Sequence, residues 1–415
     1  MLRIIFLTFF TCSFFNIFYA QSTTEKTTLN VFLDCSFCDL TYFRTNVSYL
    51  NYVRDRETAD VHVLATRMRG GSNSFNYTFD FIGLGDFTDE NFQLTLSELP
   101  NITRLARTQN IAKKVEMGLV PFWVKTDLVD NLNVQIDNPT STENQVEQQM
   151  EDAWNNWVFS VEAGGSASVE SSKKRFVGYG RVRANRVTET WRVRNQIFAR
   201  YQRQRFETAE GEDPIISATE RNFLSSSTVR SISDHISAGF FAFLARSTYN
   251  NLDLETRLAP AFEYSLFPYS EVNRREVTLA YRFNHTYRDY NELTIYEKLE
   301  EALWSQSLVF STRLQQPWGS FWTQIQGSHY LHNLEENRLE IDTRLSLRVT
   351  KGLSVSLNGE VELINDQRSL PAGDISFEDL ILSQRQIATN FRVSGSVGVN
   401  YTFGSIYNNV VNTRL

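Results

Sequence analysis

Two cysteines separated by two residues, Cys35 and Cys38, are the first groups whose type and spacing could carry chemistry. The spacing brings two sulfurs within bonding reach, and a helix predicted to start beside them would lower the pKa of the first thiol, as in redox pairs. A structural disulfide in an oxidising compartment and two partly buried thiols are the simpler interpretations. No second such pair completes a zinc-binding pattern, so the sequence predicts no metal and no cofactor.

A serine and two histidines in the segment SHYLH, namely Ser328, His329 and His332, are the best candidates for catalysis. A lipid hydrolase of the outer leaflet would need a serine nucleophile beside a histidine base. In a strand, however, Ser328 and His329 point to opposite faces and cannot form a dyad with each other. The sequence therefore favours a protein that is not an enzyme, and an outer-membrane lipid-modifying hydrolase remains the alternative.

Charged side chains that share one face of the predicted strands form a larger set. If the strands close into a barrel, these side chains face its lumen, where charges persist only when paired or hydrated. An ion-pair lattice that fills the lumen and a narrow aqueous pore are both compatible with the pattern. Because arginine is in excess, an open pore is expected to prefer small anions. The residues predicted to line the lumen are Arg181, Arg183, Arg192, Arg194, Arg257, Arg282, Arg344, Arg348, Arg392, Glu340, Asp342, Glu360 and Glu362.

The elements that must position these charges are long strands with a period of two. In 352–364 the residues Leu353, Val355, Leu357, Val361 and Leu363 fall on one face and polar residues on the other, and 338–350 alternates in the same way. Such runs are longer than ordinary globular strands and suit tilted membrane strands. A secreted β-sandwich or solenoid would also alternate, but 55 aromatic residues (31 Phe, 17 Tyr, 7 Trp) favour a membrane protein with aromatic girdles. The sequence thus predicts a mainly β fold with a C-terminal transmembrane antiparallel β-barrel over 154–403.

Eleven strands are clear in this region, and the segment 222–232 supplies a weaker twelfth, which gives the even number expected of a single-chain barrel. The predicted lipid-facing side chains include Phe159, Ile197, Leu279 and Leu308, and several tryptophans, Trp322 among them, are expected near strand ends. With twelve strands, five turns fall on the periplasmic side, and two long loops, 290–304 and 364–386, fall outside.

The segment 27–127 reads as a separate small α+β domain. A short strand opens it, Leu40 to Val53 follows with near-helical spacing, and three alternating strands come next. A second helix is predicted from Arg104, with Leu105, Ile111, Val115 and Leu119 on one side and an end near Pro121. A polar linker over 128–153 joins this domain to the predicted barrel, and 404–415 forms a C-terminal tail.

The apolar stretches and the net charge of the chain indicate where the protein is located and what it does not bind. Residues 1–20 carry Arg3 and then an apolar stretch, which predicts a secretory signal peptide. No later stretch reaches 18 apolar residues, which excludes a helical membrane protein. The net charge of -7, from 41 Lys and Arg and 48 Asp and Glu, argues against a nucleic-acid binder.

Several segments carry a family resemblance: FLDCSFCDLTYFRT and NYVRDRETADVHVL in the first domain, and RLAPAFEYSLFPYSEVNRR, QQPWGS, GSHYLH and ATNFRVSGSVGVNYTFGSIYNNVVN in the second. Together they resemble a family of largely uncharacterised Bacteroidota outer-membrane proteins. The resemblance implies a periplasmic α+β domain before a C-terminal barrel, and it transfers no catalytic residue.

The sequence therefore predicts a Gram-negative outer-membrane protein with its N-terminal domain in the periplasm. Its expected role is a porin-like pore for small solutes or a membrane anchor for a periplasmic binding domain. The expected partners are outer-membrane lipid, a periplasmic protein and a small anionic solute, with no nucleic acid.

Overall fold

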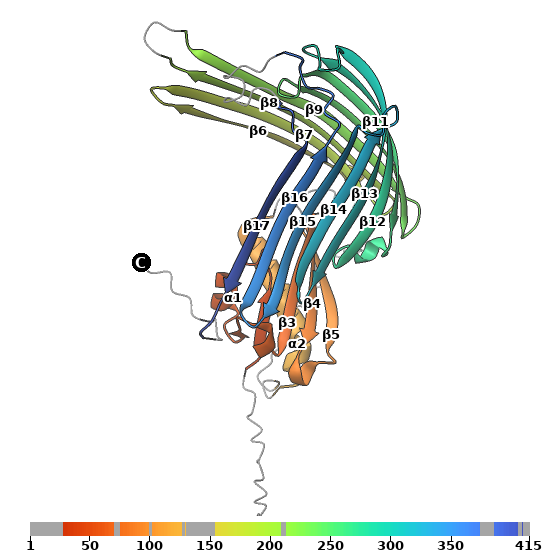
Figure 1. Ribbon diagram of the computed structural model, residues 1–415. Helices are drawn as coiled ribbons and strands as arrows, with labels where there is room; N and C mark the ends of the chain where they lie inside the picture. Colours follow the sequence, from red (N-terminus) through yellow and green to blue (C-terminus); the bar gives the residue numbers. More distant parts are fainter. Residues whose placement is uncertain are drawn as a thin grey trace, which may run out of the picture.

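The computed structural model describes residues 28–69, 75–98, 102–126, 129, 154–208, 213–373, 386–405 and 409. The predicted signal peptide, nearly all of the linker 128–153 and most of the tail 404–415 lie outside the described residues. Neither of the two described helices is both long and apolar enough to cross a membrane. The fold is mainly β, with a small α+β domain followed by one large antiparallel sheet, as the sequence predicts (Figure 1).

The N-terminal domain is a mixed five-stranded sheet with the order β2-β1-β3-β4-β5. Its strands β1, β2 and β3 are parallel, and β3, β4 and β5 are antiparallel. Side chains from both helices and the sheet form one buried core, which includes Phe43, Phe79, Phe81, Leu119 and Phe122. The elements are β1 (Asn30–Asp34), α1 (Leu40–Asn46), β2 (Asn51–Tyr52), β3 (Val61–Arg69), β4 (Phe75–Gly83), β5 (Asn91–Glu98) and α2 (Arg104–Trp123).

Two details of this domain correct the sequence prediction. The helix predicted from Leu40 ends at Asn46, because the buried side chains of Val47 and Leu50 turn into the core and the chain then pairs beside β1 as β2. In α2, Leu105 is 60% exposed rather than part of the buried stripe. At 3.6 residues per turn it lies about 80° from the centre of that stripe.

The large sheet contains twelve antiparallel strands that pair in chain order, which confirms the predicted number. The segment that was the weakest in the sequence is β9, one of the longest strands. The strands are β6 (Trp157–Val169), β7 (Lys173–Val187), β8 (Trp191–Phe206), β9 (Ile215–Ser231), β10 (Ile236–Ser247), β11 (Leu252–Ser265), β12 (Arg275–Tyr290), β13 (Glu300–Gln316), β14 (Gly319–Tyr330), β15 (Asn337–Thr350), β16 (Leu353–Ile364) and β17 (Phe391–Tyr401).

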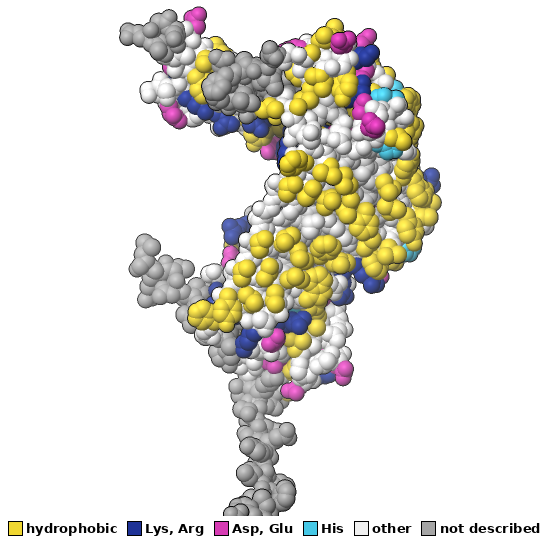
Figure 2. Space-filling model, viewed as in Figure 1, with side chains coloured by type: hydrophobic (Ala, Val, Ile, Leu, Met, Phe, Trp, Pro, Cys, Tyr) yellow, Lys and Arg dark blue, Asp and Glu magenta, His cyan; other side chains and the backbone are white. Residues whose placement is uncertain are grey.

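The two faces of this sheet differ in polarity because each strand alternates. The convex face carries exposed apolar side chains, which Figure 2 shows gathered over β12 to β17. The predicted lipid-facing residues Phe159, Ile197, Leu279 and Leu308 are all exposed there. The concave face carries the polar phase. Figure 1 shows the sheet curving strongly, with β6 to β9 forming an arm, and Figure 2 shows that the molecule is hollowed below this arm.

The sheet is open in the structure. Within the described residues, β6 pairs only with β7 and β17 pairs only with β16, so these two strands are its edges. The side chains of β17 are exposed along its whole length. Twelve strands in strict up-and-down order place β6 antiparallel to β17, which is the orientation that closure into a barrel requires.

The N-terminal domain lies at one end of the large sheet, which we call the domain end (Figure 1). The five connections predicted as turns lie at this end, and the two long loops lie at the opposite end, which we call the loop end. The loop predicted at 290–304 spans only 291–299, because alternating residues extend β13 back to Glu300.

The packing of α2 on β4 gives a first prediction. A side chain at Gly118 would overlap the ring of Phe81, which is buried and cannot move aside. We expect Gly118→Ala to destabilise this packing by about 1–3 kcal/mol, although alanine favours helix. Amide hydrogen exchange in the full chain should then be about 5 to 150 times faster across α2. The exposed neighbour Met117→Ala is the control, and equal exchange rates in the two variants would refute the packing.

Candidate functional site

The charged residues predicted to line a lumen all lie on the concave face. The cross-strand register shows this, because side chains directly opposite each other share a face. Glu340, for example, lies opposite Glu362, and Glu362 lies opposite Arg392. Likewise Arg183 lies opposite Gln196 on the next strand.

Only part of this set is paired. Arg392 lies 3.5 Å from Glu362, Arg181 lies 3.2 Å from Glu162, and Arg257 lies 2.6 Å from Glu255. By contrast, Arg194 and Arg282 form no ion pair with any described residue. The concave face is therefore not a complete ion-pair lattice, and the unpaired charge on it includes arginine.

One cavity on this face concentrates the arginines. It has a volume of about 760 Å³ and lies against β7 to β12. Its lining includes no aspartate or glutamate among the described residues. The arginines come from four strands: Arg183, Arg194, Arg257 and Arg282. Two of the four, Arg183 and Arg257, contact a glutamate outside the cavity, and the other two keep an unpaired positive charge that favours anions.

A second cavity, of about 480 Å³, adjoins the first toward the loop end and has a different character. Most of its arginines are paired with acidic side chains, although Arg282, which lines both cavities, forms no ion pair with a described residue. Arg288, whose side chain is 14% exposed, donates to Glu255 at 2.8 Å and to the hydroxyl of Tyr330 at 3.1 Å. Arg338 lies 2.8 Å from Asp366. This end of the concave face is filled by a network rather than lined by free charge.

A buried arginine from the last long loop ties the loop end together. Arg368 is 8% exposed and lies 2.7 Å from Glu301 and 2.6 Å from Glu336. Burial lowers the pKa of Arg368, but the hydrogen bonds with both carboxylates outweigh it and raise the pKa above its ordinary range. Sequence analysis missed this group, because a loop residue does not follow the alternation that assigns strand residues to a face.

The same loop is held by backbone pairing. The amide of Ile295 donates to the carbonyl of Leu370 at 2.9 Å, and the amide of Ala372 donates to the carbonyl of Leu293 at 2.8 Å. Thr294 and Pro371 form an isolated antiparallel bridge. The segments 291–299 and 365–373 therefore form one unit, which we call the loop clamp, with Arg368 beneath it.

The candidate catalytic residues do not come together. His329 lies on the convex phase and contacts Gln306 at 2.7 Å, whereas Ser328 lies opposite Ser307 on the concave phase. His332 lies in the next connection, 3.6 Å from Glu336. Among the described residues, no hydrogen bond joins Ser328 to either histidine.

Trp322 lies near the start of β14, in keeping with the predicted place near a strand end, but not on the apolar face. It lies on the concave face, where the guanidinium of Arg344 stacks over its ring at 5.0 Å. The reason is the phase of β14, whose odd-numbered residues Phe321 and Ile325 belong to the convex face.

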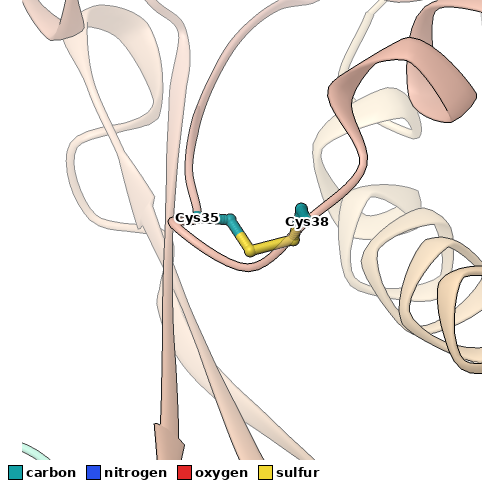
Figure 3. The surroundings of a disulfide bond; sticks show 2 residues. All are labelled: Cys35 and Cys38. Carbon is teal, nitrogen blue, oxygen red and sulfur yellow. A yellow bond between two sulfur atoms is a disulfide. The ribbon is translucent and has the colours of Figure 1, made fainter. Parts of the chain in front are cut away.

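Cys35 and Cys38 form a disulfide bond between the end of β1 and the start of α1 (Figure 3). Within the described residues, no three His, Cys, Asp or Glu side chains are grouped so that they could hold a metal ion. No protein-family model matches the chain, and no curated protein matches its sequence.

Next to the disulfide, Asp34 connects the two parts of the molecule. It contacts Nε2 of the fully buried His62 at 3.2 Å and lies 2.6 Å from Arg348 of β15. The guanidinium of Arg348 also lies over the ring of Phe32, 5.6 Å from its centre. Arg348 was predicted to line the lumen. It lies in the concave phase of β15, and its position at the end of that strand also brings it to the N-terminal domain.

Further polar contacts surround this ion pair. The amide of Gly352 donates to Asp55 at 2.6 Å, and Asn273 donates to Thr78 at 2.9 Å. From beyond β17, Asn409 accepts from the amide of Tyr52 at 2.7 Å. These contacts join two connections of the large sheet and a residue after β17 to the N-terminal domain. Sequence analysis could not find them because the two partners of each contact lie far apart in the chain.

The pKa of Asp34 gives a pH prediction. Burial raises this pKa, but the hydrogen bond with His62 and the charge of Arg348 outweigh it, so it lies below the ordinary value of 3.8. A lowered folded-state pKa contributes stability that is present above the unfolded value and is lost as the pH falls through the folded value. In calorimetry of the full chain, we expect Asp34→Asn to lower the Tm of the N-terminal domain at pH 7 by about 5 °C.

The Asp34→Asn variant should also lose part of the decline in Tm below about pH 4. Arg348→Gln should reproduce most of the loss at pH 7, and the exposed Asp89→Asn should change little. An Asp34→Asn curve parallel to that of the wild type at all pH values would contradict the assignment.

The loop clamp gives a third prediction. Arg368→Met leaves Glu301 and Glu336 almost buried without a cation, and breaking such a pair costs about 3–5 kcal/mol. We expect hydrogen exchange across 291–299 and 365–373 to increase at least a hundredfold. Arg246→Met, which breaks a half-exposed pair with Asp253, should have little effect. If the amides of these two segments stay protected from hydrogen exchange in Arg368→Met, backbone pairing alone holds the loop clamp and the prediction is wrong.

Proposed function

We propose that this chain is an outer-membrane protein whose twelve-stranded sheet closes into a barrel and passes small anions. The amphipathic sheet supports the membrane part of the proposal. Long strands expose an apolar convex face, and such a continuous apolar surface is unfavourable in water but suits lipid. Closure would join the two unpaired edges, β6 and β17, whose apolar phases both face outward.

The observation that carries the anion preference is the cavity lined by Arg183, Arg194, Arg257 and Arg282 without a carboxylate. Fixed positive charge in a low-dielectric channel attracts anions and repels cations. The net charge of the whole chain is negative, so the preference comes from the local arrangement and not from the overall composition.

The same proposal assigns the domain end to the periplasm, with the resemblance noted in the sequence as further support. There the N-terminal domain would stand at the mouth of the barrel, held by Asp34 and Arg348. These contacts also favour a second candidate function, in which the barrel serves as a membrane anchor for a periplasmic binding domain. The separation of Ser328 from His329 gives no support to a lipid hydrolase.

Single-channel recording of the refolded full chain in a planar bilayer tests the proposal. In a tenfold KCl gradient we expect discrete steps and a reversal potential with the sign of chloride selectivity. Arg368→Met should conduct more than the wild type, because the loop clamp narrows the loop end. Silent membranes with both proteins would refute the pore and leave the anchor, and cation selectivity would refute the role of the arginines.

A further inference from the structure

We propose that the arginine cavity is a binding site for a small solute carrying two linked oxyanion groups, of which a diphosphate is the simplest. The inference rests on the proposed function in one respect, that the solute reaches the cavity through the interior of the sheet. It adds to that function a defined site, a ligand class and the residues that hold the ligand.

The unpartnered guanidinium groups of two arginines support binding of an oxyanion. Arg194 and Arg282 both line the cavity, and neither has a hydrogen-bond or ion-pair partner among the described residues. The Nε atom of Arg282 is buried and unpartnered. A buried donor left without an acceptor costs free energy, and a bound oxyanion would supply the missing acceptors.

The positions of the four arginines on the sheet support a ligand with two anionic groups. Arg183 and Arg194 come from β7 and β8, whereas Arg257 and Arg282 come from β11 and β12. The strands β9 and β10 lie between these two pairs. In each pair one arginine also contacts a carboxylate, Arg183 with Glu162 and Arg257 with Glu255, and the other forms no ion pair with a described residue. Two separate free guanidinium groups match a ligand with two anionic groups better than one with a single group.

The surface between the two pairs of arginines also suits an oxyanion ligand. On β9, Ser227 lies opposite Arg194, and Ser225 lies opposite Gln196. These small hydroxyl side chains leave space and can donate to oxyanions. On β10, the next strand, the ring of Phe241 supports the guanidinium of Arg282 at 4.8 Å. Stacking fixes the plane of the guanidinium, so Arg282 loses less conformational entropy when it binds an oxyanion.

The position of the cavity argues for a dissolved ligand rather than a lipid. The cavity lies on the concave face, opposite the apolar side chains of the convex face. The adjoining cavity contains Glu255, Glu336 and Glu340, which would repel the same ligand. Anion binding is therefore expected at the one cavity and not along the whole concave face.

Calorimetric titration of sodium pyrophosphate into the detergent-refolded full chain, without lipid, tests the site. We expect saturable binding, weaker binding of orthophosphate, and at least a tenfold loss of affinity in Arg194→Gln and in Arg282→Gln. Arg194→Lys keeps the positive charge but loses the planar guanidinium, so its affinity for pyrophosphate should fall between those of the wild type and Arg194→Gln.

The matched control is Arg344→Gln. Arg344 lies on the same face and forms no ion pair with a described residue, but it lines a different cavity. Its replacement should change the affinity less than twofold. Equal losses of pyrophosphate affinity in Arg344→Gln and Arg194→Gln would overturn the site. They would show that the positive charge of the whole concave face attracts the ligand. Absence of pyrophosphate binding to folded wild type would also overturn it.

Bilayer recording separates this inference from the proposed function. An anion-selective channel in a protein that does not bind pyrophosphate would preserve the pore and refute the site. Pyrophosphate binding that depends on Arg194 and Arg282, in a protein that forms no channel, would preserve the site and refute the pore.

Discussion

The alternation of mainly apolar and mainly polar residues along the twelve strands is the constraint on which the rest of this structure depends. A slip of one residue in any pairing would move a whole set of apolar side chains to the concave face and a set of charges to the convex face. The observed register keeps the two sets apart from β6 to β17. Every feature of the candidate site follows from this separation, because it collects the charges on one side.

The concave face is then divided along its length. At the loop end, arginines are neutralised by buried carboxylates, and the loop clamp adds Arg368 to that network. In the middle, Arg194 and Arg282 have no such partners. At the domain end, Arg348 pairs with Asp34 of the N-terminal domain. The same residue type thus stabilises a loop, presents free charge and holds a domain, and its surroundings decide which.

Local patterns made the large sheet predictable. A period of two identifies each strand and the face of each charge, which is why residues such as Arg183 and Glu362 could be assigned from the sequence. Ser328 and His329 could be separated by the same rule. The pattern failed where no repeating phase exists: α1 ended early because Val47 and Leu50 entered the core, and Arg368 lay in a loop.

Long-range contacts were also beyond the sequence. Asp34 and Arg348 are separated by 314 residues, and nothing in the surroundings of either one indicates the other. The proposed closure of the sheet has the same character. Alternation shows that β6 and β17 have matching faces, but their pairing depends on the curvature accumulated over all the strands between them.

Disulfide crosslinking of the two edge strands in lipid bilayers tests the central claim most directly. Single cysteines would replace Ser160, Glu162 or Ser166 on β6 and be combined with cysteines at Arg392, Ser394 or Ser396 on β17, all on the concave phase. The account predicts intramolecular crosslinks in an antiparallel ladder, so that positions further along β6 pair with positions earlier in β17. Crosslinks that form only between two copies of the chain, or none at all, would contradict a closed barrel.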